Sequence, residues 1–375
     1  MKIFIQSYTS EWEPAVTAFN QRLAPQRMPV YFQFPQRCVP QWLPPREGCR
    51  IWQEYFLAIE DDTTVRGGYF LKTQDFWVDG QVETVGNLQL PLSEGIVDPR
   101  YGFVGVQLVL NALTRQPLLY SLGMGGLENP YPRLLRGLKW SMFLVPFFFR
   151  VMKPARFLRG LPSLRTSATR KLGLDLLAMT GTGWLGVHLL QRLASRRVRR
   201  SPGCDVEIQL GFGDWADEVW EASHRQYTLV AARDRDSMEA LYGGNAFPRL
   251  IVLRMTRDRR DIGWATVLDT AMSGHRQFGD LRVGSIVDGF SAANDAPAVI
   301  HAATSFLEQR GVDLIVSNQT HRAWVEGLRA SGFLKGPSNF ALAMSRALAA
   351  RIPSCEERWG EFHFNRGDGD GPINL

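Results

Sequence analysis

The sequence contains few of the residues from which metal sites and nucleophile motifs are built. Six histidines and four cysteines are scattered over 375 residues, and the cysteines form no C-x-x-C pair or other zinc-ligand spacing. Neither a P-loop nor a G-x-S-x-G elbow is present. We therefore expect no bound metal, and the spacing of the cysteines indicates a reducing compartment.

A signal peptide is also missing from the N-terminal stretch MKIFIQSYTSEW, which is too polar and too short in its apolar run. Together with the cysteine spacing, this predicts a cytoplasmic protein. The C-terminal stretch has a D-x-D-G turn at Asp368 and Asp370, but it lacks the further oxygen ligands and terminal glutamate of a calcium loop. We expect a flexible or sheet-edge tail there.

Negative charge is almost absent from one segment of the chain. Residues 150–200 contain twelve lysines and arginines and one acid, Asp175, whereas the whole chain has a formal net charge of +6. Within this segment, Leu172–Leu190 is an apolar run long enough to span a membrane, although its four glycines and balanced flanking charges oppose a span. The alternatives are an interfacial helix on an anionic membrane, which flotation with anionic vesicles would test, and an ordinary packed interdomain helix.

The most informative stretch runs from Val82 to Leu113. Three leucines at alternate positions over Leu88–Leu92 predict a half-buried strand. Pro99 ends this strand, and Gly102 and Gly105 open an apolar helix. The N–H groups at such a helix start, with close-approach glycines beside them, are typical of a phosphate-binding turn.

This stretch resembles the acyl-CoA pyrophosphate loop of the GNAT acyltransferase superfamily, in which V-x-P at a strand end precedes an R-G-x-G-x-G/A turn. Val97-x-Pro99 and the helix start at Gly105 match, and Val104 stands at the place of the middle glycine. The resemblance implies that acetyl-CoA or another acyl-CoA is the co-substrate. The cofactor-binding residues that it implies are Ile96, Val97, Arg100, Gly102, Phe103, Val104, Gly105 and Val106.

The order of the predicted elements supports the same resemblance. Residues 1–150 read as β-α-β-β-β-α-β-α-β, the GNAT order, and a strand–helix pattern begins again at Cys204. At a constant offset, residues 102–138 and 297–333 repeat a helix, a strand, a helix and a Gly-hydrophobe turn without a gap, which favours an internal duplication over chance similarity. We therefore predict an α/β (α+β) fold of two tandem GNAT-like domains, each a mixed, mostly antiparallel sheet flanked by helices.

The predicted domains are an N-terminal acyl-CoA domain (1–150), a basic and apolar connecting segment (151–203), a C-terminal domain without the CoA loop (204–350) and a tail (351–375). In the second domain, Asp295 lies where a pyrophosphate would bind, and a carboxylate there competes for the same N–H groups. The tyrosine that often acts as general acid in the superfamily is replaced by Arg133 and Leu328. The general acid is therefore unassigned.

Acyl transfer requires a deprotonated acceptor beside a thioester whose carbonyl is polarised by strand N–H groups. Glu83, Ser93 and Glu94 lie on or after the long strand, and Glu94 is our first candidate for the base because it sits where the strands splay. A solvated turn glutamate is the alternative. Tyr120 and its neighbour Ser121 could donate a proton to the leaving thiolate, and core packing is the alternative for Tyr120.

In the second half, Asp269 and Asp288 are predicted to end two strands, and we take them with His321 as candidate substrate-binding residues. A satisfied structural histidine is the alternative for His321. The predicted function is CoA-dependent acyl transfer to an amino-sugar or lipid-linked polysaccharide precursor, by similarity to acyltransferases of exopolysaccharide pathways. A tRNA-dependent aminoacyltransferase of the peptidoglycan-bridge type, using residues 150–200 for phosphate contacts, and a non-catalytic binding module are the alternatives. The same basic segment predicts peripheral contact with the inner face of the membrane.

Overall fold

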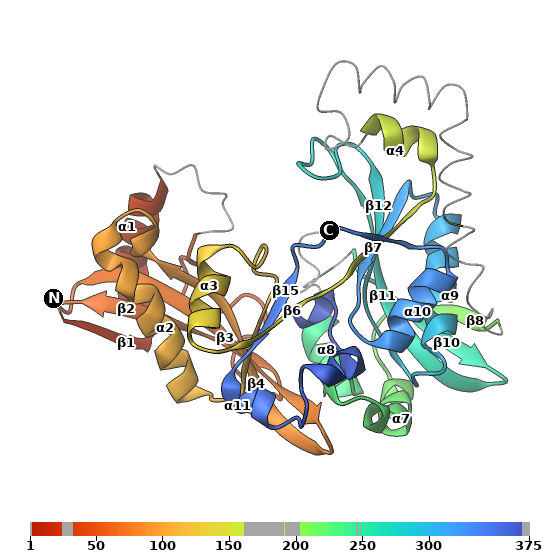
Figure 1. Cartoon of the computed structure of the whole chain (residues 1–375), viewed down its shortest axis with the longest axis horizontal. Coiled ribbons are helices and arrows are strands. Elements are labelled where there is room, and N and C mark those ends of the chain that lie inside the picture. Colours follow the sequence, from red (N-terminus) through yellow and green to blue (C-terminus); the bar gives the residue numbers. More distant parts are fainter. Residues whose placement is uncertain are drawn as a thin grey trace. The chain divides into compact units, whose positions relative to one another are not determined.

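The structure, a computed structural model, describes residues 2–24, 33–160, 191, 203–244, 247 and 249–369 (Figure 1). It separates the chain into two compact units. The first unit contains Met1–Leu144 and Asn339–Glu356, and the second contains Val145–Ser338 and Glu357–Leu375. Each unit therefore takes residues from both halves of the chain, whereas the sequence predicted contiguous domains with a boundary at residue 150.

The first unit is built on one mixed sheet with strand order β1-β2-β3-β4-β5-β15-β6. Strands β1 to β4 are antiparallel neighbours, β4 and β5 run parallel, and β15 is antiparallel to both β5 and β6. Its elements are β1 (Ile3–Ser7), α1 (Glu13–Leu23), β2 (Trp52–Glu60), β3 (Thr64–Val78), β4 (Gln81–Ser93), α2 (Gly102–Arg115), β5 (Leu119–Leu122), α3 (Pro130–Gly137), β6 (Ser141–Leu144), β15 (Ala341–Met344) and α11 (Arg346–Ala350).

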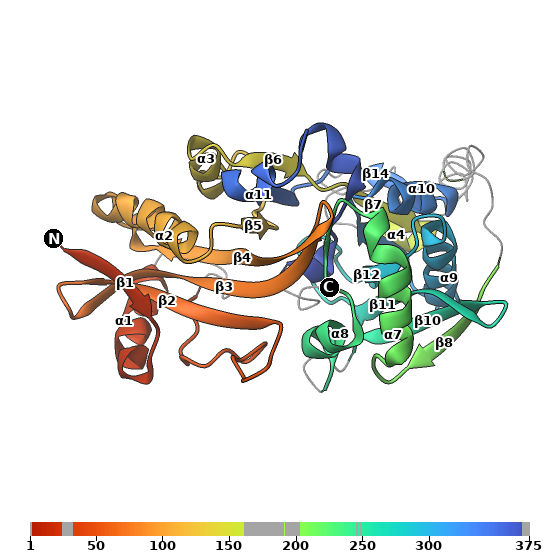
Figure 2. The same ribbon diagram turned by 90° about the horizontal axis from the view of Figure 1, so that it is seen from below.

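Helices cover both faces of this sheet because successive side chains of a strand point to opposite sides. On β2, Leu57 and Ile59 pack in one buried cluster with residues of α1, whereas Phe56 and Ala58 pack in another with residues of α2 and α3. Figure 2 shows α1 and α2 on opposite sides of strands β1 to β4. The near-continuous burial of β2 follows from this double cover.

The second unit has a sheet with strand order β14-β7-β13-β12-β11-β10-β8. Its elements are β7 (Phe147–Val151), α4 (Pro154–Gly160), β8 (Asp205–Gln209), α7 (Asp214–Ser223), β9 (Leu229–Ala231), α8 (Arg235–Tyr242), β10 (Ile251–Arg257), β11 (Arg260–Ala271), β12 (Arg282–Ser291), α9 (Ala296–Gln309), β13 (Leu314–Asn318), α10 (Arg322–Ala330), β14 (Leu334–Gly336) and β16 (Phe362–His363). Gly213 is the N-cap of α7, and Asp214 is its first residue.

The two sheets repeat one topology and confirm the predicted fold class. In each, antiparallel strands lead to a long strand, a helix, a parallel strand and a second helix: β4-α2-β5-α3 in the first unit and β12-α9-β13-α10 in the second. The sixth strand of each sheet, counted from β1 in the first and from β8 in the second, comes from the other half of the chain. β15, from the C-terminal half, lies between β5 and β6, and β7, from the N-terminal half, lies between β13 and β14.

This exchange corrects the predicted order and domain bounds. The order predicted for residues 1–150 ends in one strand, but β6 and β7 are two separate strands in different sheets, with Pro146, which has no N–H to donate, between them. β15 lies within the predicted C-terminal domain, residues 204–350, but it belongs to the first unit. Side-chain alternation predicts that a strand exists, but it carries no information on which sheet the strand joins.

The C-terminal residues are not a flexible tail over their described part. Phe362, Phe364 and Asn365 are completely buried, and β16 pairs in parallel with β9, so the sheet-edge expectation is the better one. The apolar run Leu172–Leu190 lies outside the described residues, and its membrane contact stays a prediction. Within the described part of the chain, no helix combines the length and apolar character that a membrane span requires.

Candidate functional site

The sheet of the first unit opens between its two parallel strands. β4 and β5 lie wholly within the described residues. Their parallel register contains only two pairs, Gly86 with Leu119 and Asn87 with Tyr120. The hydroxyl of Ser121 donates to the Leu88 carbonyl at 2.8 Å just beyond these pairs. Beyond Leu88, β4 continues to Ser93 and pairs with β3.

A β-bulge lies on the open part of β4. The register of β3 with β4 shifts between Gly68 and Phe70, and Leu90 has a φ of 41°, a left-handed conformation that is costly for a branched side chain. Pro91 follows and cannot donate to the ladder. Opposite the bulge, a Cβ on Gly67 would lie 2.7 Å from the Leu92 carbonyl oxygen, so glycine permits the close approach of the two strands. Strained backbone of this kind concentrates at functional sites.

Two short 3-10 turns connect β4 to α2. The Oγ of Ser93 accepts a hydrogen bond from the Gly95 N–H at 3.0 Å, and the Asp98 carboxylate accepts one from the Arg100 N–H at 3.0 Å. Tyr101, the N-cap of α2, makes no side-chain capping hydrogen bond. The Gly102 N–H donates to the Pro99 carbonyl of the preceding turn. The helix start beyond it has no side-chain cap from Tyr101, and the helix dipole favours an anion there.

The helix start is sterically open. A Cβ placed on Gly102 would meet nothing within 4 Å, and one on Gly105 would meet the Ser93 Cβ at 3.9 Å. Ile96 and Phe103 beside them are 49% and 41% exposed. The fold itself does not require glycine at residues 102 and 105, so the space in front of them is available to a ligand.

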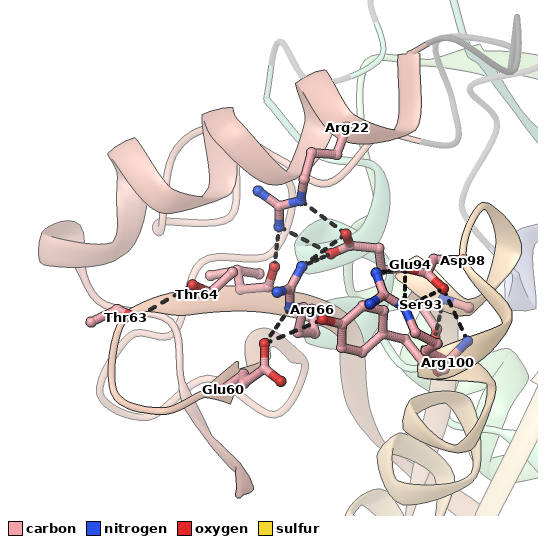
Figure 3. Close-up of polar contacts among 12 residues, drawn as sticks. Arg22, Glu60, Thr63, Thr64, Arg66, Ser93, Glu94, Asp98 and Arg100 are labelled. Atoms are coloured by element: carbon pink, nitrogen blue, oxygen red, sulfur yellow. Dashed lines mark hydrogen bonds and ion pairs between the residues drawn. The ribbon is translucent and has the colours of Figure 1, made fainter. Parts of the chain in front are cut away.

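A buried ion-pair network anchors this turn (Figure 3). Glu94 is 5% exposed, and its carboxylate accepts hydrogen bonds from Arg22 at 3.0 Å and from Arg66 at 2.9 and 3.0 Å. Arg66 also donates to Glu60 at 2.7 Å, and its guanidinium lies 4.2 Å from the centre of the Tyr101 ring. These contacts tie α1 and β3 to the turn that leads into α2.

The three predicted catalytic residues, Ser93, Glu94 and Tyr120, make contacts that support the fold. Both oxygens of Glu94 are engaged by guanidinium groups, so Glu94 is not a solvated turn residue. Ser93 accepts from Gly95 and donates to the Tyr101 carbonyl at 3.2 Å. Tyr120 is fully buried with its ring edge-on to Phe76. Catalytic roles for these residues stay predictions.

The predicted cofactor-binding residues come together around the helix start, but they differ in exposure. Arg100 is exposed, and its guanidinium binds the Asp98 carboxylate at 2.6 Å. Val104 is completely buried in the core cluster under α2, because it points toward the sheet. Sequence reasoning missed Arg22 and Arg66, since nothing near either residue in the sequence signals a partner at Glu94.

The predicted substrate-binding residues of the second unit also make structural contacts. Asp269 lies within β11 and binds Arg282 at 2.6 Å and Arg310 at 2.8 Å, and the hydrogen bond from Arg282 is the main cause that lowers its pKa. Asp288 lies within β12, is 1% exposed and accepts hydrogen bonds from buried side chains. The sequence had predicted that both residues end strands, but each lies inside its strand.

At the start of α9, Asp295 forms an ion pair with Arg257 at 2.7 Å. The predicted acid is therefore present at this helix start and already has a cationic partner. His321 is the N-cap of α10, and its Nδ1 accepts from the Ala323 N–H. Desolvation by burial, with a smaller effect of Arg322, lowers the pKa of His321 to about 4 from an ordinary 6.5.

This pKa shift predicts a loss of stability in mild acid. Between pH 6.5 and about 4 the unfolded chain protonates His321 while the folded chain does not, so the free energy of unfolding should fall with pH by roughly 3 kcal/mol over this window. We expect His321→Asn, which keeps a capping acceptor, to flatten this dependence in urea unfolding at several pH values. His301→Asn, at an exposed position of α9, is the control. An equal loss at pH 5 and pH 7 for His321→Asn would mean that the residue acts only as a cap.

The fold is similar to that of solved GCN5-related N-acetyltransferases and other N-acyltransferases. The structure is similar to a GCN5-related N-acetyltransferase from Anabaena variabilis ATCC 29413, with a TM-score of 0.51, 8% identity, and coverage of 91% of this chain and 72% of that one. A conserved protein of unknown function from Enterococcus faecalis V583, described as a probable N-acyltransferase, has a TM-score of 0.52, 9% identity, and coverage of 93% and 74%.

Saccharomyces cerevisiae N-myristoyltransferase with bound myristoyl-CoA is similar at a TM-score of 0.50 and 9% identity, with coverage of 91% of this chain and 82% of that one. No protein-family model and no curated protein matches the sequence. At these identities the likeness establishes the fold, and the activity has to be argued from the site.

Proposed function

We propose that the protein is a CoA-dependent acyltransferase that binds its acyl donor in the first unit. The observation that carries this proposal is the opening of the sheet between β4 and β5 next to an uncapped, sterically open helix start. A pantetheine arm is narrow enough to lie between two diverging strands, and the pyrophosphate suits the N-terminus of α2. The fold of the solved N-acyltransferases supports the same reading.

In this proposal the β4 backbone beyond Leu88 polarises the thioester carbonyl through its N–H groups. The acceptor nitrogen or oxygen attacks the carbonyl carbon, a C–N or C–O bond forms, and the C–S bond breaks with release of the CoA thiol. Glu94, held by Arg22 and Arg66, keeps the turn in position for the phosphates. An amino-sugar or lipid-linked polysaccharide precursor is the acceptor that we propose, and membrane contact through residues 150–200 would bring the enzyme to it.

A second candidate function is a non-catalytic acyl-CoA-binding module. It is favoured by the structural contacts of Ser93, Glu94 and Tyr120, which leave the base and the acid without an assigned residue. The two candidates share the donor site and differ in turnover. A test of the proposed function must therefore measure binding and product formation separately.

Calorimetry and thermal unfolding with acetyl-CoA, myristoyl-CoA, free CoA and tRNA provide the binding test. An acyl-CoA at 100 times its Kd should stabilise the protein by about 2.7 kcal/mol. Release of the CoA thiol in the presence of glucosamine or other amino-sugars then reports turnover. Binding with acceptor-dependent release supports the enzyme, binding without release supports the module, stabilisation by tRNA alone supports aminoacyl transfer, and no binding of any ligand contradicts all three.

A further inference from the structure

The sheet of the second unit also opens between its parallel strands, but a segment of the chain lies in this opening. The register of β12 with β13 runs from Val283 with Leu314 to Ile286 with Ser317, while β12 continues to Ser291. A register shift of β11 with β12 between Thr266 and Val267 marks a bulge at this point. The arrangement is the counterpart of the opening between β4 and β5.

Residues Phe362–Asp368 bind to both sides of this opening, with Phe362–Asn365 extended and Arg366–Asp368 forming a 3-10 turn that Asn365 caps. On the β13 side, the Thr320 N–H donates to the Phe364 carbonyl at 3.2 Å, and the Phe364 N–H donates to the Thr320 hydroxyl at 2.8 Å. An isolated bridge joins Gln319 to Asn365. On the β12 side, Nε2 of His363 lies 2.8 Å from the Gly289 carbonyl oxygen. The segment therefore makes strand-like backbone contacts in addition to side-chain contacts.

Buried charged and polar groups fix its position along the opening. Arg233 is 1% exposed and donates to both oxygens of Asp368 at 3.0 Å and to Asp288 at 3.2 Å. Asp288 also accepts from Asn365 at 2.6 Å and from the Tyr242 hydroxyl at 2.8 Å. Nη2 of Arg233 is shared between the two Asp368 oxygens while its Nε donates to Asp288, and such charge-assisted hydrogen bonds are the strong ones. Arg233 thus recognises the Asp368 carboxylate of the bound segment.

The fit is close at Gly367. A Cβ at this residue would lie 2.7 Å from the Oδ2 of Asp288 and would also overlap the Tyr242 hydroxyl. A side chain at this position would require the segment, Asp288 or the Tyr242 ring to shift. The contacts of Asn365, Gly367 and Asp368 together define a sequence requirement, as a ligand site does and a loosely packed tail does not.

We propose that the opening between β12 and β13 is a binding site for a peptide that is extended and then forms a 3-10 turn, and that the chain's own residues Phe362–Asp368 occupy it. The ligand class is a short segment whose capped 3-10 turn has an amide at the Asn365 position, glycine at the Gly367 position and a carboxylate at the Asp368 position. This site lies in the second unit and is independent of acyl-CoA binding in the first, so a failure of one proposal does not affect the other.

A cleavable linker tests this site in the full chain. A protease site inserted between Glu356 and Glu357, which are both exposed and lie at the boundary of the two units, is cut after folding. We expect the released fragment to stay bound during gel filtration and to exchange for a labelled synthetic peptide of residues 357–369. Immediate loss of the fragment, with no uptake of the peptide, would overturn the proposal.

Competition with variant peptides distinguishes sequence-specific recognition from nonspecific binding. Asp368→Ala and Gly367→Ala peptides should compete about tenfold to hundredfold less well than the unchanged peptide, because each removes a charge-assisted contact or introduces an overlap. A Glu357→Ala peptide, altered at an exposed position, should compete like the unchanged one. Equal competition by all peptides would contradict a specific site. If the cut protein unfolds, hydrogen exchange of residues 362–368 in uncut Gly367→Ala protein, expected to be faster than in the wild type, decides the same question.

Discussion

A tryptophan at position 102 should remove acyl-CoA binding and leave the protein folded. Gly102 is exposed at the start of α2, and a Cβ there meets nothing within 4 Å, so the fold accommodates a side chain. The indole would fill the space in front of the helix N–H groups, where we place the pyrophosphate. We expect Gly102→Trp to weaken acetyl-CoA binding at least about hundredfold, or about 3 kcal/mol, in calorimetry.

Gly137→Trp is the matched control for this variant. Gly137 is also exposed, also has nothing within 4 Å of an added Cβ, and lies at the C-terminal end of α3 in the same unit. Because α3 runs back from the C-terminal end of β5, this position is at the other end of the sheet from the start of α2. Gly137→Trp should bind acetyl-CoA like the wild type. Unchanged binding in both variants would show that α2 does not hold the phosphates.

The largest effect on stability is expected for Arg233→Met. This change leaves the carboxylates of Asp288 and Asp368 in the core without their cation, and Arg233 is itself 1% exposed. Removing one partner from a buried charge cluster costs about 3–5 kcal/mol. The free energy of unfolding, measured by urea denaturation, should fall by this amount, and the midpoint should fall with it.

Arg235→Met provides the comparison two residues along the chain. Arg235 forms ion pairs with Asp214 and Asp236, but all three side chains are exposed, so the free energy of unfolding should stay close to that of the wild type. A similar loss in both variants would mean that general charge removal, and not the buried cluster, destabilises the protein.

Local patterns predicted the elements of the candidate site well. The expected helix over residues 102–115 is α2, Gly102–Arg115, because its start has glycine after a proline turn and its buried residues recur with helical spacing. The long strand is β4, but it ends at Ser93 and not at Pro99 as predicted, because two 3-10 turns lie between the strand and α2. Each of these features depends on residues that are close together in the sequence.

Contacts between distant residues could not be predicted in the same way. Glu94 meets Arg22 and Arg66, which are 72 and 28 residues away, and no pattern near Glu94 distinguishes a buried anchor from an exposed base. The burial of residues 362–368 has the same origin, since Arg233 binds Asp368 from 135 residues away. A charged residue in a polar stretch looks solvated until its partner is known.

The exchange of β7 and β15 has a consequence for biosynthesis. β6 emerges from the ribosome long before β15, yet β15 lies between β5 and β6 in the finished sheet. At roughly 5–20 residues per second, the 200 residues from Leu144 to Met344 take about 10–40 s to synthesise. During that time β5 and β6 present unpaired edges to other nascent chains. The first unit can therefore complete its sheet only after β15 has been synthesised, and its two edges are open to wrong pairing until then.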